Sequence, residues 1–364
     1  MNIYSASARH CDLRLFCCAA SFAAFIGVTV SATAASAQPV DACVTKDVVK
    51  LQEYAGLIHN IVPWVGIEAG IFDRHCLEII MVPISSGPAA YAASLQGGVD
   101  FISTAPETLL VPYSQGMNVK FVAGINTSIH YAMVVRPDLD LPSEAEGFPA
   151  VMKDLVGKRI GVNALGSTTH ALARTNFVAA GINPDEANWV AYGAPAAGFA
   201  ALENGTLDAI EVFSDGMDIA AAITGGKIIG DLRDPTTASL PIINKMRGVS
   251  LSWAAQSSYI EKNREVVNRF VIANSEAIGW ARNPGNFEEV LRLVRENAPS
   301  PEGVEDSEGL LLTRVNGYLP QLNDKLSVSS LEAWAQFALD NGRIPEPVNM
   351  GTLIWEGSAS LVVP

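Results

Sequence analysis

Residues Gly161–Phe177 read GVNALGSTTHALARTNF, an apolar strand followed by a glycine turn, a hydroxyl cluster and the start of a helix. A strand-to-helix turn points backbone N–H groups and the positive end of the helix dipole outward, which favours an anion. The glycine spacing is similar to that of a phosphate loop, but Ser167 stands where a nucleotide-binding loop needs its lysine. The stretch therefore predicts a site for an anion other than ATP.

Strand and helix patterns alternate in two similar rounds, over residues 48–103 and 154–212. Ala89–Phe101 (AAYAASLQGGVDF) and Ala196–Ala209 (AAGFAALENGTLDA) share a small-residue helix, a glycine-containing turn and a Val/Leu-Asp step into a strand. Such repeated β-α-β order predicts an α/β fold with parallel sheets in two lobes of similar build. The pattern becomes helical after about Tyr259, and we interpret this tail as a helical layer packed on the first lobe.

The N-terminal segment Met1–Ala37 has Arg9 and Arg14, then an apolar run, and ends in Ala-Ser-Ala. This layout is typical of a cleavable secretory signal, and the apolar run is shorter than the ~20 residues of a membrane-spanning helix. We therefore expect a periplasmic protein. Of 364 residues, 327 remain after cleavage, enough for about two domains, with a net charge of −15. This acidic balance excludes nucleic acid and anionic membranes as favoured partners.

Two cysteines, Cys43 and Cys76, remain after the signal is removed. In an oxidising compartment they most simply form a disulfide with each other. The alternative is two buried thiols. A metal site is disfavoured because two cysteines without a nearby histidine pair provide only half of a zinc coordination shell.

Several stretches resemble the periplasmic substrate-binding proteins of ABC importers of the nitrate, sulfonate and taurine type, which are related to thiamine-pyrimidine precursor proteins. They recur in the family's order over roughly residues 48–299. The stretches are PWVGIEAGIFDRHCLEIIMVPISSGPAA, LQGGVDFISTAPETLL, GMNVKFVAGI, DLVGKRIGVNALGSTTHALAR, AAGINPDEANWVAYG and ALENGTLDAIEV.

The resemblance implies a two-lobed periplasmic-binding-protein clamshell (type II) with two crossing strands. Lobe one would comprise residues 44–133 plus 249–364, and lobe two residues 134–248. The solute, a small organic anion such as a sulfonate, a taurine-like compound or an aromatic carboxylate, would lie in the cleft between them. The partners implied are the membrane permease and ATPase subunits of an importer. We expect a monomer without a cofactor, and a neutral pyrimidine is the alternative solute.

Candidate contacts in lobe one follow its strands. Hydroxyl groups beside a glycine can donate to a carboxylate or sulfonate, although they can also serve only as helix caps. A histidine here is as consistent with the core as with the ligand, and a tryptophan could form an aromatic wall. The predicted contacts are His59, Asn60, Trp64, Ser85, Ser86, Gly87 and Thr104. Glu107, close behind Thr104, is expected to face solvent or to cap a helix.

Lobe two would supply the opposite half of the ring from the turn quoted above and from two later strand ends. Helix capping is again the alternative for the hydroxyls, and packing for the histidine. The predicted contacts are Ser167, Thr168, Thr169, His170, Tyr192, Ser214 and Asp215. Arg174 and Arg247 are interpreted as surface charges, so the affinity would come from N–H and hydroxyl dipoles in a closed cleft.

Catalysis is the main alternative class of function. Distant relatives include pyrimidine synthases with a cysteine-rich iron-binding stretch, which the two remaining cysteines of this chain cannot provide. The sequence also has no nucleophile elbow and no zinc-protease helix. We therefore predict a binding protein and not an enzyme.

Overall fold

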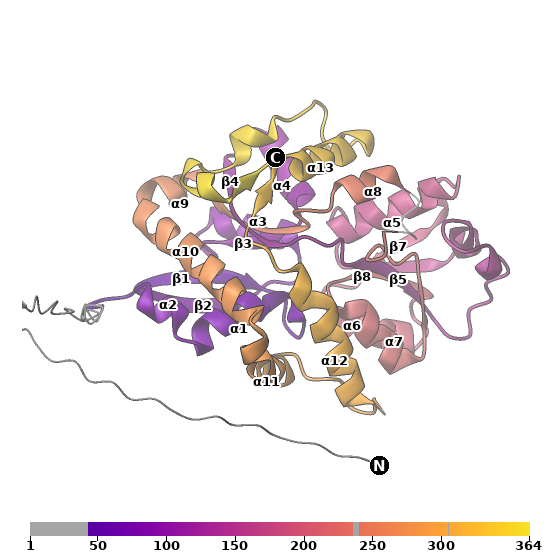
Figure 1. Ribbon diagram of the computed structural model, residues 1–364. Coiled ribbons are helices and arrows are strands. Elements are labelled where there is room, and N and C mark those ends of the chain that lie inside the picture. The colour runs from indigo at the N-terminus through magenta and orange to yellow at the C-terminus, as the bar shows by residue number, and fades with distance from the viewer. Residues whose placement is uncertain (1–42, 236–239, 305) are drawn as a thin grey trace, which may run out of the picture. The chain divides into compact units, whose positions relative to one another are not determined.

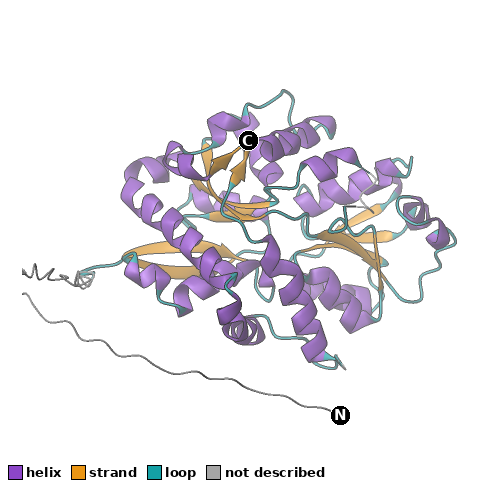
Figure 2. Ribbon diagram, viewed as in Figure 1, coloured by secondary structure: helices purple, strands orange, loops and turns teal. Residues whose placement is uncertain are grey.

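The computed structural model describes residues 43–235, 240–304 and 306–364, and ten of its strands form two groups with one common order, while β11 and β12 form a separate pair. In the first group the order is β2-β1-β3-β10-β4, with β1 and β3 joined by the Leu51–Phe101 bridge. In the second group it is β7-β6-β8-β5-β9. We call the part with β1–β4 and β10 the first lobe and the part with β5–β9 the second lobe. Figure 2 shows helices flanking both groups of strands.

One strand in each lobe runs against its neighbours: β10 in the first lobe and β5 in the second. The other long pairings, β1 with β2 and β6 with β7 and β8, are parallel. The bounds of the strands are Asp47–Glu53 (β1), Leu77–Pro83 (β2), Ile102–Thr104 (β3), Val119–Asn126 (β4), Tyr131–Val135 (β5), Arg159–Val162 (β6), Asn188–Ala191 (β7), Ala209–Phe213 (β8), Lys227–Ile229 (β9), Leu251–Gln256 (β10), Leu326–Ser327 (β11) and Val362–Val363 (β12).

The helices that cover the strands begin where the turn chemistry of the sequence places them. Proline occupies the first turn of α3, α4, α6 and α8, where its missing N–H costs nothing. The bounds are Ile61–Glu68 (α1), Ile71–Arg74 (α2), Gly87–Leu95 (α3), Pro106–Ser114 (α4), Thr168–Ala179 (α5), Pro195–Glu203 (α6), Gly216–Thr224 (α7), Pro241–Lys245 (α8), Ser257–Lys262 (α9), Arg264–Ala281 (α10), Phe287–Asn297 (α11), Ser307–Tyr318 (α12) and Val328–Asp340 (α13).

The chain passes between the lobes twice, after β4 and before β10. β5 pairs along its whole length with β8 of the second lobe. The expected boundary between Met133 and Val134 therefore divides a single strand, and the first passage lies over residues 127–130 instead. Residues 1–37, the expected signal, lie outside the described residues.

The C-terminal helices do not cover the first lobe alone, as the sequence pattern had suggested. In α13, Leu331 and Ala335 pack into a core cluster with first-lobe residues, whereas Trp334 and Phe337 pack into one with second-lobe residues. Figure 1 shows α12 and α13 where the two lobes meet. Apolar residues on two faces of α13 explain the difference, because each face buries against a different lobe.

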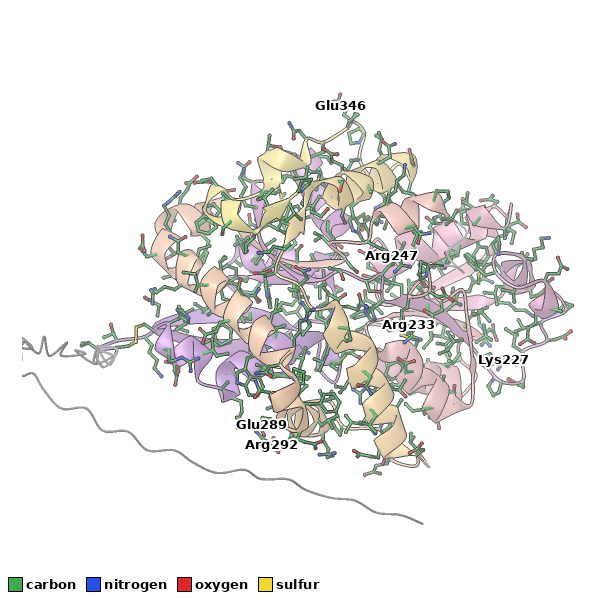
Figure 3. All side chains as sticks on the ribbon, in the orientation of Figure 1. Lys227, Arg233, Arg247, Glu289, Arg292 and Glu346 are labelled. Atoms are coloured by element: carbon green, nitrogen blue, oxygen red, sulfur yellow. A yellow bond between two sulfur atoms is a disulfide. The ribbon has the colours of Figure 1, made fainter. Side chains whose placement is uncertain are left out.

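The predicted disulfide between Cys43 and Cys76 is present, with the two Cα atoms 5.5 Å apart. It ties the segment before β1 to the residue before β2, at one end of the first lobe (Figure 3). Among the described residues, no helix has the length and apolar character needed to cross a membrane.

Candidate functional site

Two small polar cavities lie between the lobes. Each leaves about 20 Å³ open to the centre of a water molecule, which is room for little more than one water. His59, Tyr131, Phe213 and Leu251 line both, so the cavities adjoin. The "hinge cavity" is also lined by Asn126, Ser128, His130, Ser214, Ser250 and Tyr318. The "cleft cavity" is also lined by Tyr54, Gly87, Thr104, Ala105, Thr108, Asn163, Ser167, Thr168 and Thr169.

Neither lining contains a side chain with a formal charge. Burial lowers the pKa of His59 to about 3, with His130 contributing, and burial likewise lowers the pKa of His130 to about 3. Both imidazoles are therefore neutral near pH 7. Aromatic rings form one wall, because Tyr54 lies 4.6 Å from His59 and 5.0 Å from Phe213 between ring centroids.

The N-terminus of α5 contributes backbone donors to the cleft cavity. Gly166 has φ of 80°, which a residue with a Cβ rarely adopts, and this turn brings Ser167 to the helix start. The Ser167 hydroxyl does not cap the helix; it donates to the Ala164 carbonyl (2.7 Å) and lies 2.8 Å from the Thr169 hydroxyl. Within the described residues, the N–H groups of Thr168, Thr169 and His170 have no hydrogen-bond partner.

Thr168 also joins the two lobes. Its hydroxyl donates to Glu107 Oε2 (3.0 Å) at the start of α4 and lies 2.9 Å from the Thr108 hydroxyl. Glu107 is fully buried, contrary to the exposed or capping position that the sequence suggested. Burial raises the pKa of its carboxyl group, and Arg343, whose Nη2 lies 2.9 Å from Oε1, opposes this rise. Arg343 also donates to the Gly166 carbonyl (2.6 Å), so this cluster holds α5 against the first lobe.

The turn before α3 supplies the facing wall. Ser86 caps α3 by accepting from the Ala89 N–H (3.3 Å), while the Ser85 carbonyl accepts from the Asn163 side chain across the cleft. A Cβ at Gly87 would lie 2.5 Å from the Thr104 hydroxyl, so only glycine fits this close approach. Gly87 and Thr104 line the cleft cavity, whereas the hydroxyl of Ser86 is used as a cap.

The loop after β8 brings Ser214 and Asp215 to different places. Ser214, with φ of 60°, lines the hinge cavity. Asp215 does not line either cavity: its carboxylate accepts from Arg314 Nε (2.6 Å) on α12 and from the Ile58 N–H (3.2 Å). Both charged side chains are buried, so the sequence-based assignment of Asp215 as a ligand contact is replaced by a structural ion pair.

Four other predicted contacts lie outside the two linings. Trp64 packs in the first-lobe core, because the inward face of α1 carries it there. The Asn60 side chain closes its own turn by bonding the N–H (3.0 Å) and carbonyl (2.7 Å) of Tyr54. The Tyr192 hydroxyl donates to the Glu211 carbonyl (3.1 Å). His170 accepts from the Gly166 N–H (3.1 Å) and packs on Trp189.

The sequence analysis missed several lining residues, and some of them had a signal. Tyr54 follows β1 directly, as Asn163 follows β6, so the rule that sites lie at strand ends could have found both. Thr108 lies one helical turn after Thr104. His130 and Tyr318 had no local signal, because the passage between lobes and α12 meet only in the folded chain.

Metal-ligating side chains do not gather in the described part of the chain, where no group of three or more His, Cys, Asp or Glu could hold an ion. The lining instead offers N–H, hydroxyl and amide donors beside aromatic rings. Such a lining can bind a small polar solute through hydrogen bonds.

A sequence model of proteins described as NMT1/THI5 like matches residues 61–286. No curated protein is matched by the sequence. The aliphatic sulphonate binding protein SsuA from Escherichia coli has a similar structure, with a TM-score of 0.62 and 18% identity over 86% of this chain and 98% of that one. For the alkanesulfonate-binding protein SsuA from Xanthomonas axonopodis pv. citri, bound to MOPS, the values are 0.66, 15%, 85% and 99%.

An enzyme also has this fold. The desulfurization enzyme DszB has a TM-score of 0.58 and 17% identity, over 86% of this chain and 98% of the enzyme. The strand order that the two lobes share and the similarity to these structures confirm the predicted two-lobed α/β clamshell. At such identities a shared fold says nothing by itself about the solute.

Proposed function

The chain belongs to the NMT1/THI5-like family, and on that premise we propose that it is a periplasmic solute-binding protein. In this proposal it captures a small organic anion, a sulfonate, a taurine-like compound or an aromatic carboxylate, between its lobes. It then delivers the solute to the permease and ATPase of an ABC importer. The signal-like segment 1–37 supports export, and the similar sulfonate-binding structures support a solute-binding role.

The observation that carries the proposal is the N-terminus of α5. Three of its N–H groups, which have no partner in the described part of the chain, and the hydroxyls of Thr168 and Thr169 lie where the lobes meet. A helix N-terminus of this kind binds anions through N–H donors and the positive end of the dipole. Hydrogen bonds to an ionised oxygen are the strong kind, so no cationic side chain is needed in the lining.

A second candidate solute is a neutral nitrogen heterocycle such as a pyrimidine. It is favoured by the absence of formal charge in the two described linings and by the neutral His59 and His130. The rings of Tyr54 and Phe213 could pack against a planar solute. The anion is preferred because a neutral heterocycle leaves the dipole of α5 unused.

One protein of similar structure is an enzyme, but the residues described for this chain do not favour catalysis. In residues 43–235, 240–304 and 306–364 the two cysteines are bonded to each other, so this part of the chain carries no thiol nucleophile. Of the two histidines in the linings, His59 bonds the Ser103 hydroxyl (2.8 Å) and both have strongly lowered pKa values. Neither is poised for proton transfer near neutral pH.

A thermal-shift screen of the purified protein tests the proposal. The panel contains alkanesulfonates, taurine, nitrate, aromatic carboxylates and pyrimidines, each confirmed by calorimetry. A solute present at a hundred times its Kd stabilises the folded protein by about 2.7 kcal/mol, which raises Tm measurably. We expect a shift with one class of organic anion. A shift with pyrimidines alone would replace the anion by the heterocycle, and no shift with any compound would contradict the binding function.

A further inference from the structure

Three buried polar atoms line the hinge cavity and have no hydrogen-bond partner among the described residues. They are Asn126 Nδ2, His130 Nε2 and Ser214 Oγ. Their residues are 2%, 8% and 3% exposed, so bulk solvent does not reach these atoms. The Tyr318 hydroxyl lies beside Asn126 and Ser214, but neither of the two atoms completes a hydrogen bond with it. Buried polar atoms without a partner destabilise a fold, so three of them around one cavity indicate a bound group.

The three atoms come from both lobes and from the passage between them. Asn126 is the last residue of β4, His130 ends the first passage, and Ser214 follows β8. Hydrogen bonds to the backbone hold all three segments in place. The Ser214 N–H donates to the His130 carbonyl (2.9 Å), and Asn126 Oδ1 accepts from the Ser128 N–H (2.8 Å). The unpartnered atoms are therefore fixed around the cavity.

The size and the chemistry of this cavity match one water molecule. About 20 Å³ is open to the centre of a water, and about 10–15 Å³ is enough to hold one. A buried water usually makes about three hydrogen bonds, which is the number of unpartnered atoms here. The Asn126 amide donates, the Ser214 hydroxyl donates or accepts, and one nitrogen of a neutral imidazole donates while the other accepts. A water has two protons and two lone pairs, so it can satisfy all three atoms together.

We propose that the hinge cavity binds one structural water molecule, which bridges Asn126 of the first lobe, His130 of the passage and Ser214 of the second lobe. The site is separate from the N-terminus of α5 and does not depend on the identity of the solute. A water-mediated hydrogen bond stabilises nearly as well as a direct one. The water therefore joins the end of β4 to the loop after β8 and is part of the folded protein.

A high-resolution crystal structure of the protein without added solute, from crystals grown in sodium bromide, tests the site directly. We expect one peak within about 2.7–3.2 Å of Asn126 Nδ2, His130 Nε2 and Ser214 Oγ, without the anomalous signal of bromide. A hinge cavity without a peak would overturn the inference. A bromide peak at this position would replace the water by an anion site.

Two serine variants test the same site in solution. Ser214→Ala removes a partner of the water and keeps the Cβ, so the backbone at φ of 60° is little affected. Ser252→Ala is the matched control, because Ser252 Oγ is also buried without a partner in the described part of the chain, but Ser252 lines neither cavity.

The two variants should change stability in different ways, as measured by chemical denaturation. Ser214→Ala should lower the folding equilibrium constant by about fivefold, because the water loses a hydrogen bond. Ser252→Ala should leave this constant unchanged or raise it, because it removes a hydroxyl that has no partner. Equal effects of the two substitutions would contradict a water bound at Ser214.

Discussion

The two lobes share one strand order, but they differ in the hydrogen bonding of the turn that follows the second strand of that order. In the first lobe the turn between β1 and α1 is satisfied internally: Asn60 bonds Tyr54, and the Ile58 N–H donates to the buried Asp215 carboxylate. In the second lobe the equivalent turn, between β6 and α5, keeps three N–H groups without a partner in the described residues. The first turn thus already holds an anion of the protein itself, and the second can receive one from outside.

This difference assigns separate tasks to the lobes. The Asp215–Arg314 pair belongs to the architecture, since it joins the loop after β8 to α12 and to the first lobe. In the proposed function Thr168 and Thr169 bind the solute, since they line the cleft cavity at a helix N-terminus. Variants of the two turns should therefore affect different measurements, folding stability at the first and affinity at the second.

The largest expected effect is on folding stability and concerns the first-lobe turn, between β1 and α1, whose polar groups are already hydrogen-bonded within the protein. Arg314→Met leaves Asp215 buried without its cation, so the free energy of unfolding should fall by about 3–5 kcal/mol in chemical denaturation. Arg174→Met is the control, because Arg174 forms a surface pair with Asp185 (2.7 Å) and such pairs contribute up to about 1 kcal/mol. Equal losses in the two variants would show that Asp215 is not held as described.

The second-largest loss of stability is expected on removal of the disulfide, both of whose cysteines lie in the first lobe. Replacing both Cys43 and Cys76 by serine removes a cross-link between residues 33 apart in the sequence. The free energy of unfolding should fall by about 3 kcal/mol, with the affinity for the solute unchanged, because neither residue lines a cavity. A large loss of affinity without a loss of stability would contradict the division of tasks.

The third prediction concerns the open turn. Thr168→Val keeps the shape and removes the hydroxyl, whose one proton would turn from Glu107 Oε2 to an anionic solute. Binding should therefore weaken by about 1.5–3 kcal/mol in calorimetry. Ser86→Ala is the control, because Ser86 caps α3: its loss should lower stability by about 1 kcal/mol and leave affinity unchanged. Unaltered affinity in Thr168→Val would show that this hydroxyl serves only the contact with Glu107.

The smallest effect near neutral pH is a pH dependence at the hinge. Burial depresses the pKa of His130 to about 3, below its unfolded value of 6.5. Its contribution to stability is therefore complete above pH 6.5 and is lost as the pH falls from 6.5 towards 3. His130→Gln should flatten the stability curve by up to about 1.4 kcal/mol per pH unit in this window. Parallel curves for the variant and the original protein would contradict the burial of a neutral histidine.

Much of the fold was predictable because the signals are local. Repeated strand, turn and helix patterns gave two α/β lobes, and the only cysteines left after residue 37 gave the disulfide. The turn at residues 161–177 was predicted because glycine and hydroxyl residues are typical of a strand-to-helix junction. The expected boundary falls within β5 because a short apolar strand carries no local signal of the sheet that it joins.

The candidate site was predicted only in part, because sequence spacing does not tell which face of an element turns to the cleft. Trp64 was expected at the cleft, but α1 turns it into the core. Glu107 was expected in solvent, and its burial depends on Arg343, more than two hundred residues later in the chain. The pairing of Arg314 with Asp215 likewise joins residues 99 apart in the sequence, so no local sequence pattern predicts it.

A crystal structure of the protein with the tightest-binding solute of the screen tests the central claim most directly. The account predicts an acidic oxygen of the solute within about 3.2 Å of the N–H groups of Thr168, Thr169 or His170, with the lobes closed around it. A solute whose polar group lies away from the N-terminus of α5 would contradict it.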